Sequence, residues 1–207
     1  MMIDSSKINF KIRTVCEVGT GGDTAVHQSR NLHEISDNLI LVEPNPKSFA
    51  TLNFNFGNNP KFKLYEAAIS SRSGVGKYYN WLHDSENASG FIEGQESPMM
   101  VNHGYVPNDT KDFIEVKFLK FSEIDDGKID ILFVDTEGSE WFVLRDMISK
   151  PKIIAIETHG GMKYLNPNLN LIQAWMTTNG YVPVAKDESD TLYINQDLIK
   201  LHSSINN

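Results

Sequence analysis

The sequence VCEVGTGGD, residues 15–23, carries more information about the architecture than any other stretch. It is an apolar run that ends in an acid and continues into a glycine-rich turn. The apolar residues are typical of a buried strand, and the glycines let the backbone turn tightly and approach a ligand closely. Taken alone, the stretch favours a nucleoside-cofactor site and an ordinary strand-to-helix turn equally, because it lacks a complete G-x-G-x-x-G pattern.

The composition limits the classes of protein to which this chain can belong. The chain has 207 residues, of which 40% are hydrophobic and 22% charged, and this suits one globular domain. A net charge of −8 argues against a nucleic-acid partner, because phosphate binding needs clustered Lys and Arg. Cys16 is the sole cysteine, which excludes an internal disulfide and suits a reducing compartment. Without an apolar run of about 18 residues or a signal-peptide pattern, we expect a cytoplasmic protein with no membrane partner.

Expected strands alternate with expected helices along most of the chain. Periodicity predicts strands at residues 14–18, 39–42, 62–69, 129–135, 152–157, 181–184 and 191–194. It predicts helices at residues 23–34, 47–55, 141–148 and 169–178. This alternation is typical of an α/β fold. We expect a doubly wound, mostly parallel seven-stranded sheet with one antiparallel edge strand and helices on both faces.

One segment interrupts this alternation. Residues 75–81 and 114–119 read as additional strands, and the polar residues 82–112 between them read as a long loop. A loop of that length in a compact domain is either functional or mobile. A lid over a bound substrate could be formed there by Trp81, His83, His103 and Tyr105. We therefore predict a single domain over residues 1–207, with a β-hairpin and loop insertion at about residues 74–120.

Acidic residues follow several of the expected strands. Glu17, Glu43, Asp135 and Glu157 each come at or just after a strand end, and His159 lies just beyond the last of them. Because the carboxyl ends of parallel strands meet at one edge of a sheet, we expect these side chains to gather there. Glu43 lies a little over twenty residues beyond the first glycine turn, a spacing that suits an acid that accepts hydrogen bonds from ribose hydroxyls.

Three segments together carry a family resemblance. CEVGTGG at residues 16–22, VEPNP at residues 42–46 and FVDTEGSE at residues 133–140 follow one another in an order and spacing that resemble the FkbM family. The resemblance covers about residues 14 to 160. It implies a Rossmann-like class I methyltransferase fold and S-adenosylmethionine as cofactor. It also implies O-methylation of a hydroxyl on a small molecule or glycan, with the sugar or metabolite unspecified.

The resemblance also implies roles for particular residues. Glu17, Gly19 and Gly21 would flank the methionine portion of the cofactor, Glu43 would bind the ribose, and the small Ala67 and Ala68 would let the adenine lie flat. The full cofactor-binding set is Glu17, Gly19, Thr20, Gly21, Glu43, Pro44, Asn45, Ala67, Ala68 and Asp135.

Asp135 and His159 are the predicted catalytic residues. They end neighbouring strands, and a histidine has a suitable pKa for taking a hydroxyl proton near neutrality. Structural roles remain open: Asp135 and Glu137 could cap the following helix, and His159 could be a turn residue. Asp135, Glu137 and His159 could also gather a divalent cation, since they combine carboxylate oxygen with imidazole. Their spacing matches no strong metal signature, so we predict no metal site.

Two other functions compete with methyl transfer. A nucleotide-dependent oxidoreductase would suit the sheet, but the chain lacks G-x-G-x-x-G and a clear Tyr-x-x-x-Lys pair. A non-catalytic module that binds a partner protein would suit the unusual first glycine motif. The sequence leaves the oligomeric state open.

Overall fold

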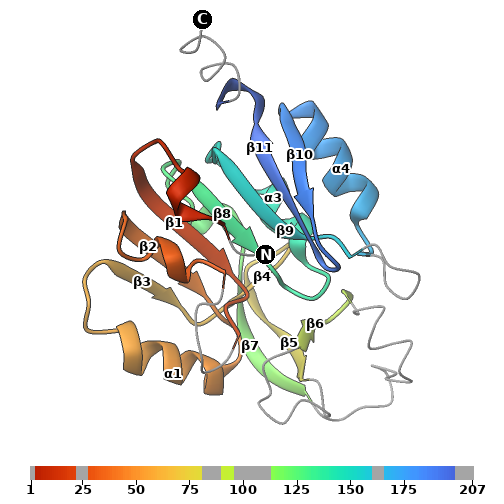
Figure 1. Cartoon of the computed structure of the whole chain (residues 1–207). Coiled ribbons are helices and arrows are strands. Elements are labelled where there is room, and N and C mark those ends of the chain that lie inside the picture. Colours follow the sequence, from red (N-terminus) through yellow and green to blue (C-terminus); the bar gives the residue numbers. More distant parts are fainter. Residues whose placement is uncertain (1–2, 22–27, 81–89, 96–112, 160–165, 199–207) are drawn as a thin grey trace, which may run out of the picture.

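The computed structural model describes residues 3–21, 28–80, 90–95, 113–159 and 166–198. Its main sheet has seven strands in the order β10-β11-β9-β8-β1-β2-β3 (Figure 1). Their bounds are β1 Ile12–Val18, β2 Ser36–Val42, β3 Phe62–Tyr65, β8 Ile131–Val134, β9 Ile153–Glu157, β10 Tyr181–Lys186 and β11 Asp190–Asn195. Each predicted strand of this sheet is found with its ends shifted by a few residues, except for residues 62–69, where the expected strand divides.

The pairing is mostly parallel, as predicted. β1 pairs in parallel with β2 and β8, β2 with β3, and β8 with β9. β11 runs antiparallel to both β9 and β10, so the antiparallel strand lies one position inside the edge and the prediction of an antiparallel edge strand was wrong. The tight β10–β11 turn explains this, because the chain first forms the edge strand β10 and then returns between β10 and β9.

Helices cover both faces of the sheet, as the pattern predicted. α1, Pro46–Phe56, packs Leu52 on Leu41 of β2. α3, Glu140–Arg145, and α4, Leu169–Thr178, cover the opposite face. There the apolar residues of the two helices join those of the sheet in the largest core cluster, which includes Cys16, Val18, Val42, Val134, Val143, Leu144, Ile172 and Met176.

The predicted helix over residues 23–34 is wrong in its described part. Residues 22–27 lie outside the described residues, and the remainder holds only a 3-10 turn at Arg30–Leu32. Ser29 gives the physical reason, because its backbone N–H and its hydroxyl both donate to the Glu17 carboxylate. These bonds join residues twelve positions apart, and the Ser29 N–H that donates to Glu17 does not also form a helical bond. The 3-10 turn still buries Leu32 against Val15 and Leu39. The expected helix over residues 141–148 also ends early, at Arg145.

A second, smaller sheet stands against the carboxyl edge of the first (Figure 1). Its order is β4-β7-β5-β6, with β4 at Ala68–Ile69, β5 at Gly74–Asn80, β6 at Gly90–Ile92 and β7 at Phe113–Leu119. The predicted single strand over residues 62–69 therefore splits, because β3 pairs with β2 whereas β4 pairs with β7. β6 falls inside the stretch read as loop, where only three residues pair with β5.

Two short 3-10 turns, Ser5–Lys7 and Phe121–Glu123, complete the elements of the described residues. Within this part of the chain, none of the helices is long and apolar enough to span a membrane. The division of the chain into one domain with an insertion stays a prediction. The arrangement has one consequence for function: the ends of β1, β2 and β8 face the small sheet across a cavity.

Candidate functional site

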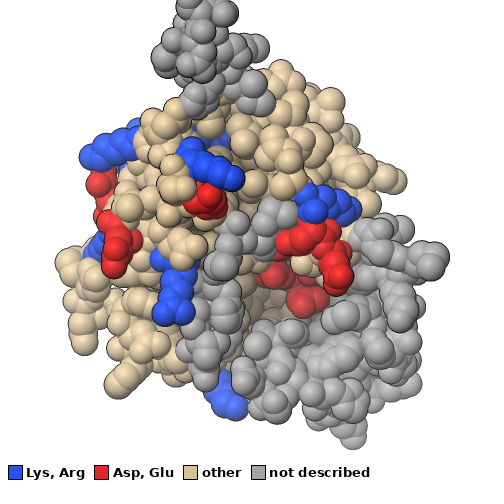
Figure 2. All heavy atoms as spheres, viewed as in Figure 1, with Lys and Arg blue, Asp and Glu red and all other residues tan. Residues whose placement is uncertain are grey.

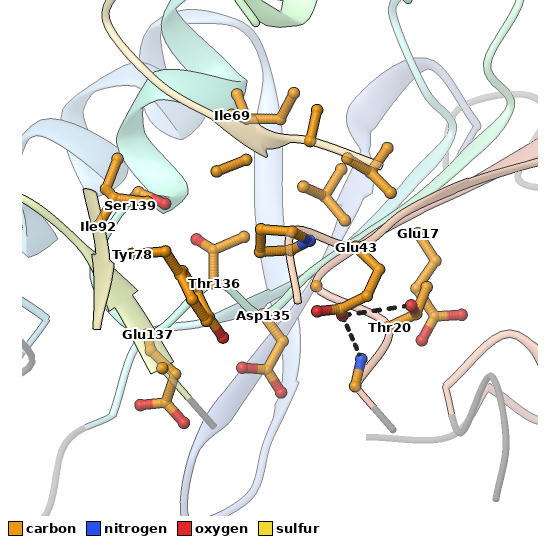
Figure 3. Close-up of a pocket in the computed structure, with 18 of the residues that line it drawn as sticks. Glu17, Thr20, Glu43, Ile69, Tyr78, Ile92, Asp135, Thr136, Glu137 and Ser139 are labelled. Carbon is orange, nitrogen blue, oxygen red and sulfur yellow. Dashed lines mark hydrogen bonds between the residues drawn. The ribbon is translucent and has the colours of Figure 1, made fainter. Parts of the chain in front are cut away.

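A cavity of about 180 Å³ opens at the carboxyl ends of β1, β2 and β8 (Figure 3). Nine of the ten residues predicted to bind a cofactor line it. They are Glu17, Gly19, Thr20, Gly21, Glu43, Pro44, Ala67, Ala68 and Asp135. Residues that are distant in sequence therefore meet at one place, as expected for the carboxyl edge of a parallel sheet.

The glycine turn after β1 passes unusually close to the end of β8. Gly19 has φ +82°, a left-handed conformation, and a Cβ atom built there would lie 1.6 Å from the carbonyl oxygen of Asp135. The Gly19 N–H donates to the carbonyl of Val42, 2.9 Å away, at the end of β2. The turn is thus held between two neighbouring strands, in a space that only glycine fits.

Glu43 ties the end of β2 to this turn. Its carboxylate is 2% exposed and accepts hydrogen bonds from the N–H of Gly21 at 2.8 Å and from the Thr20 hydroxyl at 3.5 Å (Figure 3). Its other oxygen accepts from the N–H of Asn45, also at 2.8 Å. Burial raises the pKa of Glu43 to about 7, although these hydrogen bonds partly oppose the shift.

Asn45 is the predicted cofactor residue that does not line the cavity. Its side-chain oxygen accepts from the N–H groups of Lys47 and Ser48, and so it caps the N-terminus of α1. The prediction for Asn45 does not match this position. A signal was present in the sequence, because Asn followed by Pro46 is a strong helix-start pattern.

Glu17 lines the cavity but directs its carboxylate to Ser29, whose N–H and hydroxyl both donate to it. Burial raises the pKa of Glu17 to about 7. The side chain therefore holds the chain that returns after the glycine turn.

Replacing Glu17 with Gln is expected to reduce the pH dependence of stability. Because the folded-state pKa of about 7 exceeds the ordinary 4.5, the folded protein binds more protons between these values. The free energy of unfolding therefore falls as pH rises through this window, by about 3 kcal/mol from Glu17. Urea denaturation at pH 5 and pH 8 measures the change. Between pH 5 and pH 8, the free energy of unfolding of E17Q should fall by about 3 kcal/mol less than that of the wild type. The exposed-site control E115Q should show the same fall as the wild type. An equal loss in E17Q and wild type would contradict this.

Asp135 directly follows β8 and lines the cavity beside the glycine turn. The Gln28 side-chain amide donates to it at 3.3 Å. Burial raises the pKa of Asp135 to about 7, and the negative charges of Asp190 and Glu140 add to the shift. Glu137, two residues further on, also lines the cavity and has a positive φ of 55°.

His159 is not among the residues that line the cavity. Its Nε2 atom contacts the Glu157 carboxylate, and its backbone N–H donates to the carbonyl of Ser189 at 2.7 Å. Glu157, and not His159, gathers with Asp135 and Glu137. His159 thus contacts Glu157 and is not part of the cavity lining, and its catalytic role stays a prediction.

Glu140 organises the turn between β8 and α3. It is fully buried, and its Oε1 atom accepts from Thr136 N–H at 2.9 Å, from the Thr136 hydroxyl at 2.8 Å and from Gly138 N–H at 3.1 Å. Its other oxygen accepts from the Asn166 amide at 2.6 Å. Glu140 therefore closes the turn that precedes α3, and the described N-terminus of this helix has no side-chain cap. The sequence signal was the second glutamate of DTEGSE.

The small sheet supplies a wall that the sequence did not predict. Tyr78 and Ile92 face the cavity from this sheet, on the side away from Glu17 (Figure 3). A Cβ atom at Gly90 would lie 2.4 Å from the Tyr78 hydroxyl, so Gly90 makes room for that ring. Trp81, His83, His103 and Tyr105, the expected lid residues, lie outside the described residues.

Comparison with known proteins adds a family match. Residues 16–183 match the family model described as the methyltransferase FkbM domain. No curated protein sequence matches the chain significantly.

A solved structure shares the fold, and others show weaker similarity. The FkbM methyltransferase from Methylobacillus flagellatus KT superposes with a TM-score of 0.53 at 15% identity, over 92% of this chain and 45% of that one. A candidate RNA methyltransferase from Pyrococcus horikoshii superposes with a TM-score of 0.46 at 12% identity, over 88% of this chain and 73% of that one. The ribosomal protein L11 methylase from Lactobacillus delbrueckii subsp. bulgaricus superposes with a TM-score of 0.42 at 13% identity, over 92% of this chain and 73% of that one. The chain spans less than half of the first of these proteins. Its fold is the Rossmann-like fold of class I methyltransferases.

Proposed function

Because the chain belongs to the FkbM methyltransferase domain family, we propose that it transfers a methyl group from S-adenosylmethionine to a hydroxyl of a small molecule or sugar. The observation that carries this proposal is the cavity at the ends of β1, β2 and β8, where the Gly19 turn, the Glu43 carboxylate and Asp135 meet. We further expect the protein to act in the cytoplasm.

The residues present suit this cofactor. The turn leaves room for a ligand at Gly21, where an added Cβ atom would meet no atom of the described residues within 4 Å, and the small Ala67 and Ala68 leave room for a flat base. Glu43 offers carboxylate oxygens to ribose hydroxyls, the role that a conserved acid has in dinucleotide sites. The Pro44 ring lines the same region.

The charge of the cavity lining supports S-adenosylmethionine as the cofactor rather than NAD. Glu17, Glu43 and Asp135 all line it, and Lys and Arg are absent from its described lining. Carboxylates attract a cationic sulfonium and repel a pyrophosphate. This favours S-adenosylmethionine over NAD and weakens the oxidoreductase alternative.

The chain itself has to position the acceptor and exclude water. When bound, S-adenosylmethionine supplies a methyl group that its sulfonium already activates. Asp135 accepts a hydrogen bond from the acceptor hydroxyl and orients the oxygen toward the methyl carbon. Asp135 would also take the hydroxyl proton when the oxygen is methylated. Tyr78 and Ile92 close the cavity on the side of the small sheet.

Calorimetry tests the cofactor assignment. We expect heat of binding with S-adenosylmethionine and none with NAD. Glu43→Ala should weaken S-adenosylmethionine binding about 10- to 100-fold, because hydrogen bonds to a buried charged group are lost. The exposed-site control Glu115→Ala should leave the affinity unchanged. Heat with NAD alone would favour the oxidoreductase, and no heat with either would favour a non-catalytic module.

A further inference from the structure

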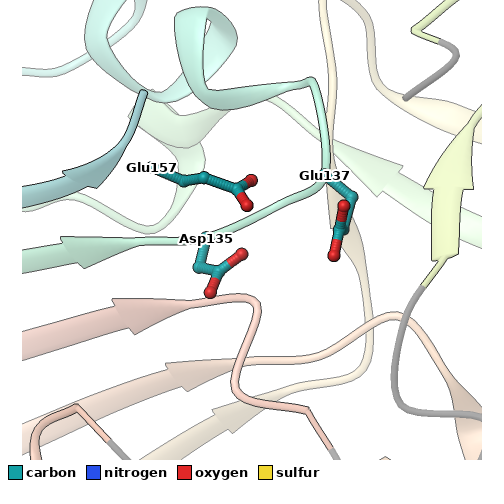
Figure 4. A group of neighbouring side chains, drawn as sticks. All are labelled: Asp135, Glu137 and Glu157. Atoms are coloured by element: carbon teal, nitrogen blue, oxygen red, sulfur yellow. The ribbon is translucent and has the colours of Figure 1, made fainter. Parts of the chain in front are cut away.

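Three carboxylates converge from separate segments at the end of the sheet. Asp135 comes from the end of β8, Glu137 from the turn that follows, and Glu157 from the end of β9 (Figure 4). One ligand oxygen from each lies within 4.8 Å of the other two. Acidic side chains also gather around the hollow on this face of the molecule (Figure 2).

Glu157 provides a second and independent observation. The residue is 4% exposed, and its Oε2 atom is buried with no hydrogen-bond donor from the described residues. Its carboxylate points toward Asp135 and Glu137 (Figure 4). A buried carboxylate oxygen without a donor is energetically costly, and a bound cation would remove this cost.

Asp135 and Glu157 have no Lys or Arg partner among the described residues. The ion pair of Glu157 is with His159, which contacts the other carboxylate oxygen, Oε1. Asp135 accepts a hydrogen bond from the neutral Gln28 amide at 3.3 Å, and its other side-chain hydrogen-bond partner is the carboxyl group of Glu157.

We propose that Asp135, Glu137 and Glu157 bind one divalent cation of the Mg²⁺ or Mn²⁺ class. Such ions prefer carboxylate oxygens at roughly 2.1 Å, so that two ligands of one octahedral ion lie roughly 3 to 4 Å apart. The observed spacing accommodates this geometry. His159 holds Glu157 through the oxygen that faces away from Oε2, in the way that outer partners orient ligating groups. This replaces the prediction of no metal site, and Glu157 takes the place that the sequence suggested for His159.

The cation has a role that rests on the proposed function. Three protein ligands leave positions open on an octahedral ion, and an acceptor with two neighbouring oxygens would fill two of them. Binding to the cation lowers the pKa of a hydroxyl and fixes its orientation. The acceptor class is therefore a hydroxyl with an adjacent hydroxyl or carbonyl oxygen, as in sugars and catechols.

Manganese binding to the full chain tests the site without any methyl donor. Free Mn²⁺ is followed by electron paramagnetic resonance during titration, and we expect one Mn²⁺ per chain, displaced by excess Mg²⁺. E157Q and D135N should each lower the affinity at least about tenfold. E137Q gives a third variant on an accessible turn in case the buried substitutions fail to fold. E115Q should bind as the wild type does.

Two outcomes would overturn the proposal. One is a wild-type protein that binds no Mn²⁺, and the other is folded E157Q and E137Q that bind it with unchanged affinity. If the protein binds no Mn²⁺ but methylates amines, the cluster serves a substrate ammonium instead and the proposal fails. Calorimetry with S-adenosylmethionine in the presence of EDTA keeps the two hypotheses apart. Cofactor binding without Mn²⁺ binding rejects only the metal, and Mn²⁺ binding without cofactor binding rejects only the proposed function.

Discussion

Replacing Gly19 with Ala is expected to abolish cofactor binding and to destabilise the fold. The left-handed conformation of this residue costs an alanine about 1–2 kcal/mol, and the added Cβ would lie 1.6 Å from the Asp135 carbonyl oxygen. That oxygen belongs to the backbone at the end of β8, so relief requires the turn or the strand end to move. Either movement displaces Glu43 or Asp135, which line the cavity on its two sides.

Gly21 provides a matched control within the same turn. Its φ is +71°, similar to that of Gly19, but a Cβ atom there meets no other atom of the described residues within 4 Å. Gly21→Ala should therefore lose only about 1–2 kcal/mol of unfolding free energy, and its affinity for S-adenosylmethionine should fall less than that of Gly19→Ala. Urea denaturation and calorimetry on both variants make the comparison. Equal behaviour of the two variants would show that the close approach to Asp135 has no part in forming the cavity.

Replacing Asp135 with Asn is expected to lower turnover about 10²- to 10⁴-fold, the contribution of a positioned group that takes a proton. Asn has nearly the same shape, so S-adenosylmethionine should still bind. The loss should therefore appear in kcat and not in the KM for the cofactor. Methyl transfer to a panel of hydroxylated glycans and metabolites, including acceptors with adjacent oxygens, provides the measurement.

His159→Ala separates the two residues predicted to be catalytic. His159 contacts Glu157 and does not line the cavity, so we describe it as a positioning residue. Its loss should lower kcat about tenfold and weaken Mn²⁺ binding, since outer partners typically contribute 10- to 100-fold to metal affinity. Full turnover in D135N would refute the acceptor-side assignment. A larger loss of turnover in H159A than in D135N would indicate that His159, and not Asp135, takes the hydroxyl proton.

Much of the fold could be predicted because its signals are local. The apolar run before Gly19 and the acid and prolines after residue 42 mark strand ends that the structure contains. α4 begins and ends at the predicted residues. The failures came where a local pattern was ambiguous. Residues 62–69 have a continuous strand pattern, but their two halves pair with different sheets.

The candidate site was predictable in part for the same reason. Strand ends in a parallel sheet meet at one edge, so Glu17, Glu43 and Asp135 could be expected together. Asn45 caps α1 and does not line the cavity, so its predicted role at the cofactor stays a prediction, whereas the helix-start signal of its segment is confirmed. The small sheet's wall of Tyr78 and Ile92 gave no signal, since β6 pairs over only three residues.

The sequence by itself determined the α/β class, the family and the edge of the sheet at which acids and glycines gather, because these depend on periodicity and on residue order. Which atoms meet there depended on the tertiary structure. Three contacts between distant segments show this. Gly19 lies in a left-handed conformation against the Asp135 carbonyl, and Glu43 accepts a hydrogen bond from the Gly21 N–H. Glu157 lies beside Asp135, where His159 was expected. The twist and register of neighbouring strands set such distances, and no single stretch of the chain encodes them.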